Sequence, residues 1–171
     1  MTYEVAELGH PVLSQQAAPV DDFGSEAFDK LVAAMLSTME ERGGVGIAAP
    51  QLAVSKQIMI VASQPNQRYP DAPRMQPMIL VNPDIVWQSR ETEKAWEGCL
   101  SVPAIRGQVE RSAKVDVSYF DRQGISKKVT FEGFPARIFL HEYDHLIGLT
   151  FLDRVVSAGD LASEVELARR L

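Results

Sequence analysis

Apolar residues recur at helical spacing between Ser25 and Glu41, where they form one stripe of an amphipathic helix. The stripe contains Phe28, Leu31, Val32, Met35, Leu36 and Met39. Ser25 is a residue type that is preferred at a helix N-cap, and two glycines, Gly43 and Gly44, follow the last apolar position. The pattern predicts a helix over residues 25–41 that packs one face against the rest of the protein.

Other segments are typical of strands. The short apolar run from Gln57 to Ala62 predicts a buried strand, and Met78 to Trp87 predicts a second strand that is bent or broken at Pro83. Lys114 to Phe120 and Ile125 to Phe131 alternate with a period of two on either side of a turn-forming segment. We therefore expect these two segments to form a β-hairpin.

Two segments fit neither pattern. Val45 to Gln51 mixes small and apolar residues, which favours a tightly packed loop. Ser63 to Pro77 contains four prolines and several polar residues, which favours an exposed loop.

The helical period returns between Phe134 and Ile147, with Pro135 near the first turn and Gly148 after the last. Apolar residues occupy much of the circumference of this segment, so we expect a buried helix. A last amphipathic helix is predicted from Asp160 to Leu171. The fold class that follows is α+β, with mostly antiparallel strands packed around the central buried helix, in a single domain over residues 1–171.

Composition narrows the classes of protein. The 171 residues are 46% hydrophobic and carry a formal net charge of -6, so we expect no direct contact with nucleic acid. Residues 1–7 have neither the basic nor the apolar region of a signal peptide, and no run of about 18 apolar residues could span a membrane. We expect a cytoplasmic monomer that has no contact with membranes. Cys99 is the only cysteine, so it is a core residue, a nucleophile or a metal ligand.

Chemistry is concentrated in the buried helix, where His141, Glu142 and His145 form an HExxH pattern. Side chains four residues apart lie on one helical face, so the two imidazoles can bind one ion. Glu142 can then take a proton from water beside that ion. If both histidines were instead ordinary core residues, burying all three polar side chains would be costly without a metal.

A hydrolytic metal site needs a third protein ligand. Phe151 stands where the longer pattern HExxHxxGxxH requires its last histidine, so that ligand set is excluded. Glu164 and Glu166 lie near the distance used by zinc proteases with a glutamate ligand, but almost at the end of the chain. Cys99, next to Gly98, is the better candidate, because thiolate binds zinc or ferrous iron strongly. A lone cysteine taken by itself is more typical of a small core residue.

Three segments together carry a family resemblance. They are Gly44-Val45-Gly46-Ile47-Ala48-Ala49-Pro50-Gln51, Glu97-Gly98-Cys99-Leu100-Ser101, and His141-Glu142-Tyr143-Asp144-His145-Leu146-Ile147-Gly148. In this order and at these separations they resemble peptide deformylase, and the resemblance extends over residues 9–153. It implies hydrolysis of the formyl group from the N-terminal formyl-methionine of newly made proteins, so the expected partners are N-formyl-methionyl nascent peptides.

The resemblance also implies residue roles. The family's metal ligands fall on Cys99, His141 and His145, and its catalytic glutamate falls on Glu142. The usual ion is Fe2+, often replaced by Zn2+ or Ni2+. The glutamine that hydrogen-bonds the oxyanion falls on Gln51, beside the backbone N–H of Leu100.

Peptide recognition is expected to use strand addition, with the substrate backbone pairing against Val45 and Gly46 on one side and the segment after Ser101 on the other. By resemblance, Arg106 contacts the peptide backbone further along the substrate. The methionine pocket is expected to be walled by the catalytic helix, with Phe134 and Ile138 as candidates.

Three further charged side chains are expected to lie close to the metal site. Arg137 also faces the expected methionine pocket, and we interpret it as a residue that lies at the rim with its charge in water. Asp144 is expected to form an ion pair with Arg111 that steadies the helix.

The chain departs from the family pattern at Leu140, where a glutamine commonly precedes the first histidine. We expect this to alter the surroundings of the metal site without loss of activity. The short C-terminal helix weakly matches longer tails that dock some members on the ribosome, so a transient ribosome contact stays open. Two alternative functions remain: a zinc endopeptidase with a downstream glutamate ligand, and a divergent, non-catalytic paralogue that binds nascent chains.

Overall fold

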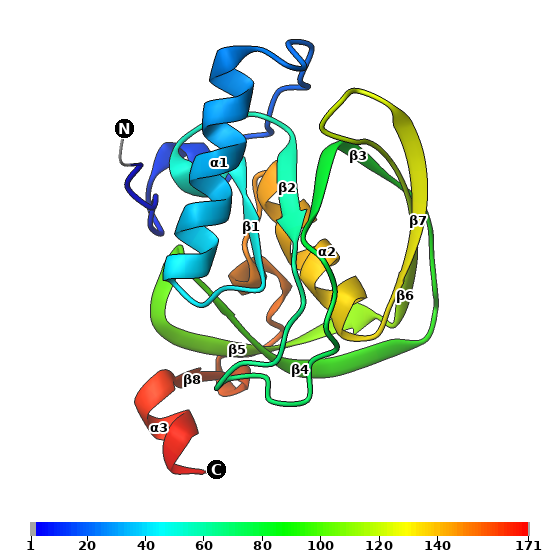
Figure 1. Ribbon diagram of the computed structural model, residues 1–171. Coiled ribbons are helices and arrows are strands. Elements are labelled where there is room, and N and C mark those ends of the chain that lie inside the picture. The colour runs from blue at the N-terminus through cyan, green and yellow to red at the C-terminus, as the bar shows by residue number, and fades with distance from the viewer. Residues whose placement is uncertain (1–2, 171) are drawn as a thin grey trace.

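The computed structural model describes residues 3–170, which form two antiparallel sheets with helices around and between them (Figure 1). The larger sheet has the order β1-β2-β3-β6-β7, and the smaller sheet has the order β4-β5-β8. The strands are β1 (Gly46–Ala48), β2 (Ile58–Val61), β3 (Met78–Gln88), β4 (Thr92–Cys99), β5 (Val102–Ser112), β6 (Lys114–Phe120), β7 (Ser126–Glu132) and β8 (Leu161–Ser163). The helices are α1 (Glu26–Glu41), α2 (Phe134–Leu146) and α3 (Glu164–Arg169), with short 3-10 turns η1 (Pro11–Ser14), η2 (Ala49–Leu52), η3 (Phe151–Arg154) and η4 (Ala158–Asp160).

The larger sheet is buried on both faces near β2, and the alternation of side chains along β2 shows why. Ile58 and Ile60 pack into a cluster with α1, whereas Met59 and Val61 pack into a cluster with α2. Successive side chains of a strand point to opposite faces, so a strand that is apolar at every position needs a cover on each side. Helices α1 and α2 provide these two covers.

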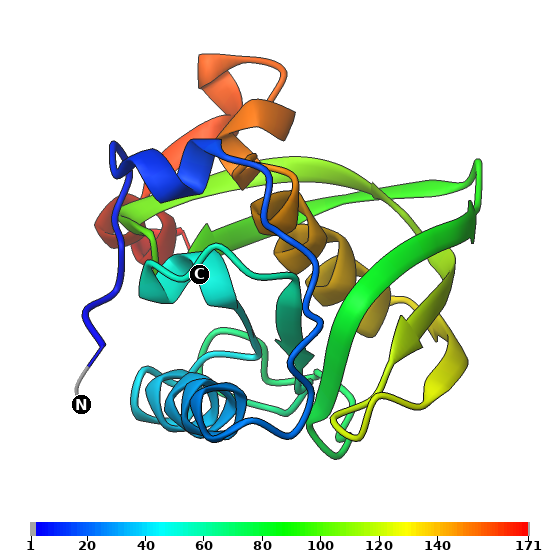
Figure 2. The same ribbon diagram turned by 90° about the horizontal axis from the view of Figure 1, so that it is seen from above.

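Helix α2 lies in the middle of the molecule, as the view from above shows (Figure 2). It contacts β1, β2 and β7 of the larger sheet and β5 of the smaller one. Phe139 is fully buried among these strands. The predicted buried helix is therefore confirmed, and its polar side chains are held between the two sheets.

Several predicted elements are confirmed. Ser25 caps α1, because its hydroxyl accepts a hydrogen bond from the backbone N–H of Phe28 at 3.1 Å. Strand β2 and the β6–β7 hairpin form within the predicted ranges, to within about one residue. The irregularity expected at Pro83 appears as a shift in the pairing of β3 with β6 between Val81 and Asp84.

Two predicted elements are wrong. Residues 45–51 are not simply a loop, because β1 pairs with β2 and η2 follows directly. Residues 160–170 are not one helix: β8 first pairs with β5, and α3 begins only at Glu164. In both cases a short strand gains its hydrogen bonds from a distant partner, which local periodicity does not report. Leu171 of the predicted helix lies outside the described residues.

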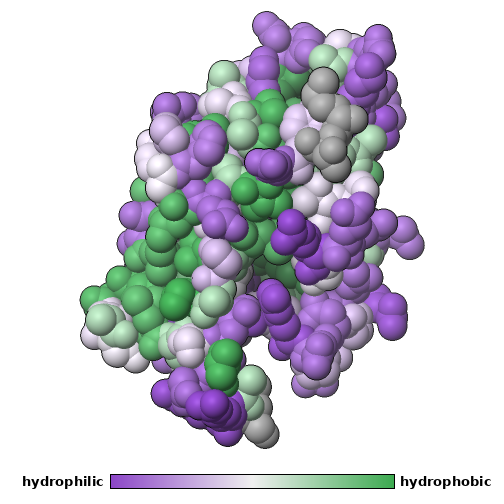
Figure 3. Space-filling view, turned by 90° about the vertical axis from the view of Figure 1, so that its left-hand side faces the viewer, coloured by the Kyte–Doolittle hydropathy of each residue, from purple (hydrophilic) through white to green (hydrophobic). Residues whose placement is uncertain are grey.

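The surface carries charged and apolar residues side by side. On the face shown in Figure 3, apolar residues (green) gather toward the lower left. Exposed apolar side chains in the described chain include Leu8, Val156 and Val165. Across residues 3–170, every helix is too short or too polar to cross a membrane.

Candidate metal centre

The two histidines of the HExxH pattern stand one turn apart on α2. Their rings are 5.4 Å apart between centroids and nearly perpendicular, and both side chains are buried. Gly133 begins the helix with a φ of 66°, and Gly148 follows it with a φ of 80°, so each end of the helix uses a left-handed backbone conformation that glycine adopts freely. The helix thus directs both imidazoles to one point between the sheets.

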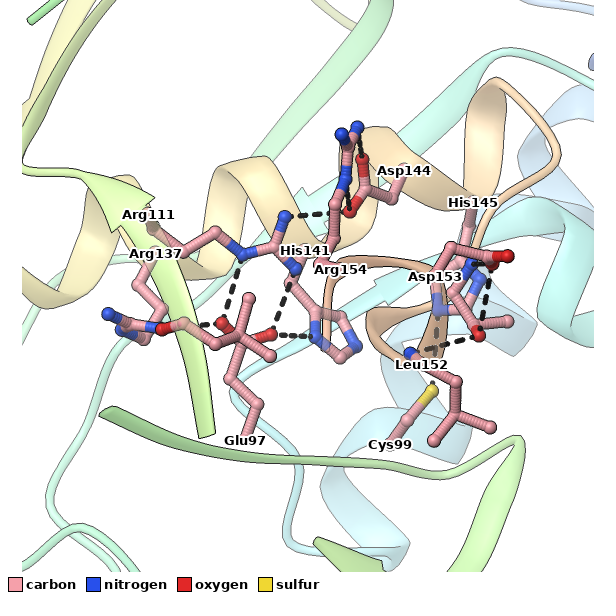
Figure 4. Close-up of polar contacts among 12 residues, drawn as sticks. Glu97, Cys99, Arg111, Arg137, His141, Asp144, His145, Leu152, Asp153 and Arg154 are labelled. Carbon is pink, nitrogen blue, oxygen red and sulfur yellow. Dashed lines mark hydrogen bonds and ion pairs between the residues drawn. The ribbon is translucent and has the colours of Figure 1, made fainter. Parts of the chain in front are cut away.

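Cys99 reaches the same point from the end of β4. Its Sγ lies 3.3 Å from Nε2 of His145, and one ligand atom from each of Cys99, His141 and His145 lies within 4.8 Å of the others (Figure 4). The sequence alone left Cys99 and a late glutamate open as the third ligand. Glu164 instead forms an ion pair with Arg68 at 3.6 Å, and Glu166 pairs with Arg169 within α3.

The electrostatics of this group favour a thiolate. Burial acts to raise the pKa of Cys99, but charge and hydrogen bonds from His145 and His141 outweigh burial and hold the pKa well below its usual value. Burial acts to lower the pKa of His141, but hydrogen bonds to Cys99 and Glu97 raise it well above its usual value. A thiolate between two imidazoles is a donor set that suits a divalent cation.

Glu142 lies beside this group in a different environment. It is 4% exposed, and its Oε2 has no hydrogen-bond partner among the described residues. Burial raises the pKa of Glu142 to about 7, although His141 and His145 act to lower it. A carboxyl group with a pKa in this range can both accept and release a proton near neutral pH.

Gln51 is fixed by its neighbours. Its Oε1 accepts a hydrogen bond from the backbone N–H of Ala48 at 2.9 Å, which leaves the amide NH2 as a donor. That Nε2 lies 3.5 Å from Sγ of Cys99 and 3.4 Å from Oγ of Ser101. Gln51, the expected oxyanion donor, therefore lies beside Cys99 with its NH2 group directed toward Cys99 and Ser101.

Cys99 and His141, with Glu142 and Gln51, line a cavity that opens to the surface. The expected substrate residues that line it share an apolar or backbone character, and they are Val45, Gly46, Leu100, Phe134 and Ile138. Gly46 is tightly enclosed: an added Cβ would lie 2.7 Å from Oε1 of Glu142 and 2.7 Å from Cγ2 of Ile138. Asn66, Arg68 and Tyr69, which were not predicted as site residues, also border the cavity from the 63–77 loop.

Arg106 stands behind the cavity wall. Its Nη2 donates a hydrogen bond to the hydroxyl of Tyr69 at 2.8 Å, and its guanidinium carbon lies 5.5 Å from the centre of the Tyr69 ring. The side chain is 8% exposed, and its Nε has no partner among the described residues. An added Cβ at Gly98 would collide with this Nε at 2.9 Å, so the close approach of the two requires glycine.

Two strand edges border the cavity. β1 is the end strand of the larger sheet, and β4 is the end strand of the smaller sheet. Both contribute lining residues, Gly46 from β1 and Gly98 from β4. The segment after Ser101, which was expected to pair with substrate, becomes β5 and lies between β4 and β8 over residues 105–107. The edge available on this side therefore belongs to β4.

A cluster of buried charged side chains packs against α2 next to His141. The expected pair is present, with Nη1 of Arg111 donating to Oδ2 of Asp144 at 2.6 Å, and Arg154 also binds Asp144. Glu97, which sequence reasoning did not assign to the site, accepts a hydrogen bond from Nδ1 of His141 at 2.8 Å. Burial acts to raise the pKa of Glu97, but hydrogen bonds and charge from His141 and Arg111 outweigh burial and hold the pKa well below its usual range.

The interpretation of Arg137 as a rim residue is wrong. The side chain is 7% exposed, and its Nη1 donates to Oε2 of Glu97 at 2.6 Å. A carboxylate inside the protein gives the guanidinium a partner that water would otherwise supply. Leu140 is buried in the apolar cluster around α2, an environment that suits an apolar side chain before His141.

Residues 2–160 match the family profile described as polypeptide deformylase. The chain belongs to this family. Deformylases are metal-dependent hydrolases that remove the formyl group from the N-terminal formyl-methionine of newly synthesised proteins, and this is the function of the chain.

Individual relatives agree with this family. Peptide deformylase 2 of a Nostoc species is 47% identical over 162 residues, which cover 95% of this chain and 90% of that protein. Peptide deformylase 2 of Shewanella oneidensis is 46% identical over 150 residues, covering 88% and 82%. Among solved structures, a class I type b peptide deformylase from Acinetobacter baumannii with Met-Ala-Ser bound has a TM-score of 0.88 at 50% identity, covering 91% of this chain and 99% of that one.

Proposed function

We propose that this deformylase holds its catalytic ion with Cys99, His141 and His145, and that Fe2+ is the native ion, with Zn2+ or Ni2+ able to replace it. The observation that carries the proposal is the convergence of the three ligand atoms within 4.8 Å beside the cavity. Three protein ligands leave a coordination position open for water or substrate, as a hydrolytic site requires.

The surroundings fit an ion at this point. A buried thiolate and two buried imidazoles are costly to keep together without a cation. Oε2 of Glu142 is buried without a partner among the described residues and lies next to the ligands, where water bound beside the ion would satisfy it. When bound, the ion supplies Lewis acidity that lowers the pKa of water and polarises the formyl carbonyl.

Three groups of the protein carry out proton transfer and stabilise the oxyanion. Glu142 accepts the proton of the attacking water, whose oxygen forms a bond to the formyl carbon. Nε2 of Gln51 and the backbone N–H of Leu100 donate hydrogen bonds to the developing oxyanion. Glu142 then delivers the proton to the leaving amine as the C–N bond breaks, which releases formate and a free N-terminus.

We propose that the formylated peptide adds as a strand between the edges of β1 and β4. Its backbone pairs with Val45 and Gly46 on one side and with Gly98 on the other. Phe134 and Ile138 receive the methionine side chain. The Acinetobacter structure was solved with Met-Ala-Ser bound, which supports a site that accepts a peptide beginning with methionine.

Further along the substrate, we propose that Arg106 contacts the peptide backbone once Tyr69 moves aside. The unpartnered Nε of Arg106 supports this role. We also propose that residues 1–171 act as one catalytic domain in a monomer, and that the protein meets its nascent chains in transient contact with the ribosome.

A formate-release assay tests the proposal. Formyl-Met-Ala is offered to the iron, nickel and zinc forms, with acetyl-Met-Ala and an unformylated longer peptide in parallel. We expect formate from formyl-Met-Ala, fastest with the iron form, and no cleavage of the other two peptides. Cleavage of an internal bond of the unformylated peptide without formate release would favour an endopeptidase instead.

A further inference from the structure

Arg137 connects the two elements that carry the metal ligands. Its Nη2 donates to the backbone carbonyl of Glu93 at 2.6 Å, and its Nη1 donates to the carbonyl of Val109 at 2.9 Å and to Glu97 at 2.6 Å. Glu93 and Glu97 belong to β4, which ends in Cys99, whereas Arg137 and His141 belong to α2. These bonds therefore fasten the strand that carries the thiolate to the helix that carries the imidazoles.

Glu97 is the centre of this connection (Figure 4). Its Oε1 accepts from Nη2 of Arg111 at 2.9 Å and from Nδ1 of His141 at 2.8 Å. Its Oε2 accepts from Nε of Arg111 at 3.0 Å and from Nη1 of Arg137 at 2.6 Å. Both oxygens thus have two donors, and the carboxylate is 3% exposed, so water competes little with these bonds.

The two arginines have different positions. Arg111 lies on β5, the strand next to β4, and it also binds Asp144. Arg137 lies on the same helix as His141, one turn earlier, so it holds Glu97 relative to the helix that carries the ligand. Arg111 reaches the same helix through Asp144, three residues after His141, so the two arginines hold Glu97 to α2 on either side of the ligand.

We propose that Arg137 is a positioning residue for the metal centre. This proposal rests on the proposed function. Arg137 holds Glu97 against Nδ1 of His141. The proton then stays on Nδ1, and the lone pair of Nε2 points toward the metal site. It also sets the separation between Cys99 and the two histidines. Groups that hydrogen-bond a metal-ligating histidine typically change metal affinity by 10- to 100-fold when they are replaced, and Arg137 acts on His141 through such a group, Glu97.

The test compares metal binding by four variants with the wild type. Arg137→Met keeps most of the side-chain volume and removes all donors, and Arg137→Lys keeps the charge but cannot donate in a planar fork. Arg122→Met is the matched control, because Arg122 pairs with Asp29 at the surface. Met35→Ala is a stability control, because Met35 is fully buried in the cluster around α1, away from the ligands.

Three quantities are measured for each protein: the Zn2+ dissociation constant by competition with a chelator, the absorption bands of the Co2+ form, and the melting temperature. We expect Arg137→Met to raise the dissociation constant 10- to 100-fold and to shift the Co2+ bands. Arg137→Lys should restore part of the affinity. Arg122→Met should match the wild type, and Met35→Ala should lower the melting temperature without changing either metal readout.

Wild-type affinity and Co2+ bands in both Arg137 variants would overturn the inference. So would equal weakening of Zn2+ binding in Met35→Ala, because the effect would then reflect stability alone. If Arg137→Met does not fold, Arg137→Lys with wild-type affinity and bands still refutes the proposal. A wild-type protein that binds Zn2+ but releases no formate contradicts the proposed function and leaves this metal test standing.

Discussion

Two carboxylates near His141 have opposite surroundings, and this contrast supports the different roles proposed for them. Glu97 receives hydrogen bonds from two arginines and one imidazole, so its ionised form is strongly stabilised. Glu142 is equally buried, but its Oε2 has no donor among the described residues, so its pKa is raised. Environments that separate the pKa values of neighbouring acids assign one to structure and the other to proton transfer.

The role of Glu142 predicts the result of one substitution. Glu142→Gln keeps the shape of the side chain and removes its ability to accept a proton. We expect formate release to fall by about 10²- to 10⁴-fold, while the bound metal remains at one equivalent. Steady-state formate release and metal analysis measure both effects, with the exposed Glu132→Gln as control. A Glu142→Gln protein with wild-type turnover would disprove the assignment.

The close approach of Gly46 to Glu142 predicts a second result. In Gly46→Ala the added methyl group would lie 2.7 Å from Oε1 of Glu142, so the carboxylate must move. Displacement of a catalytic group by about 1 Å can cost about 10²-fold in rate, and we expect a loss of this order in kcat/KM. Gly159→Ala is the control, because its nearest neighbour, Oγ of Ser157, would be 3.6 Å away. Equal activities of the two variants would contradict the prediction.

At the scale of elements, the helices have separate tasks. α2 carries the histidines between the sheets, and its ends are defined by Gly133 and Gly148. α1 covers the opposite face of the larger sheet and contributes no residue to the ligand group. Changes to α1 should therefore affect stability and leave the chemistry unchanged.

The N-cap of α1 offers a test of this separation. Ser25→Ala removes the hydroxyl that accepts from the N–H of Phe28, and we expect the free energy of unfolding to fall by about 1 kcal/mol. Formate release per folded protein should not change. Ser37→Ala on the same helix is the matched control, because Ser37 bonds only the exposed Glu41 side chain. Urea unfolding measures the difference, and equal stability of the two variants would rule out the cap.

At the scale of the whole molecule, the cavity lies where the two sheets present their end strands. β1 and β4 are far apart in sequence, and α2 brings them to the same opening. The C-terminal segment completes the smaller sheet, because β8 pairs with Ile105, Arg106 and Gly107 of β5. This pairing covers a strand edge that would otherwise be open to other chains.

Two truncated chains should distinguish the contributions of β8 and α3 to stability. A chain that ends at Ser163 loses only α3 and the exposed Arg68–Glu164 pair, so we expect its stability to fall by no more than ~1 kcal/mol. A chain that ends at Asp160 keeps the Lys94–Asp160 pair but also loses β8, and we expect a further loss of about 2 kcal/mol from broken backbone hydrogen bonds, together with aggregation. Urea unfolding and light scattering measure both effects. Identical behaviour of the two chains would show that β8 contributes nothing.

Much of the site was predictable from short sequence patterns. On a helix, the HExxH spacing places His141 and His145 on one face. Apolar residues around most of that helix predicted that it is buried, so its polar side chains were expected to have a function. The structure places all three expected ligands together and pairs Asp144 with Arg111. Glu97 precedes Cys99 by two residues, but this spacing indicates a shared side only on a strand, and no strand was predicted over residues 92–99.

The sequence by itself determined what depends on neighbouring residues: the capped helix at Ser25, the hairpin of β6 and β7, and the buried HExxH helix. Only the tertiary structure decided what depends on distant partners. The short strands β1 and β8 form because other strands pair with them, and Arg137 is buried because Glu97 stands opposite. Local periodicity reports the direction of a side chain, but only the fold brings an opposite charge or a strand edge within bonding distance.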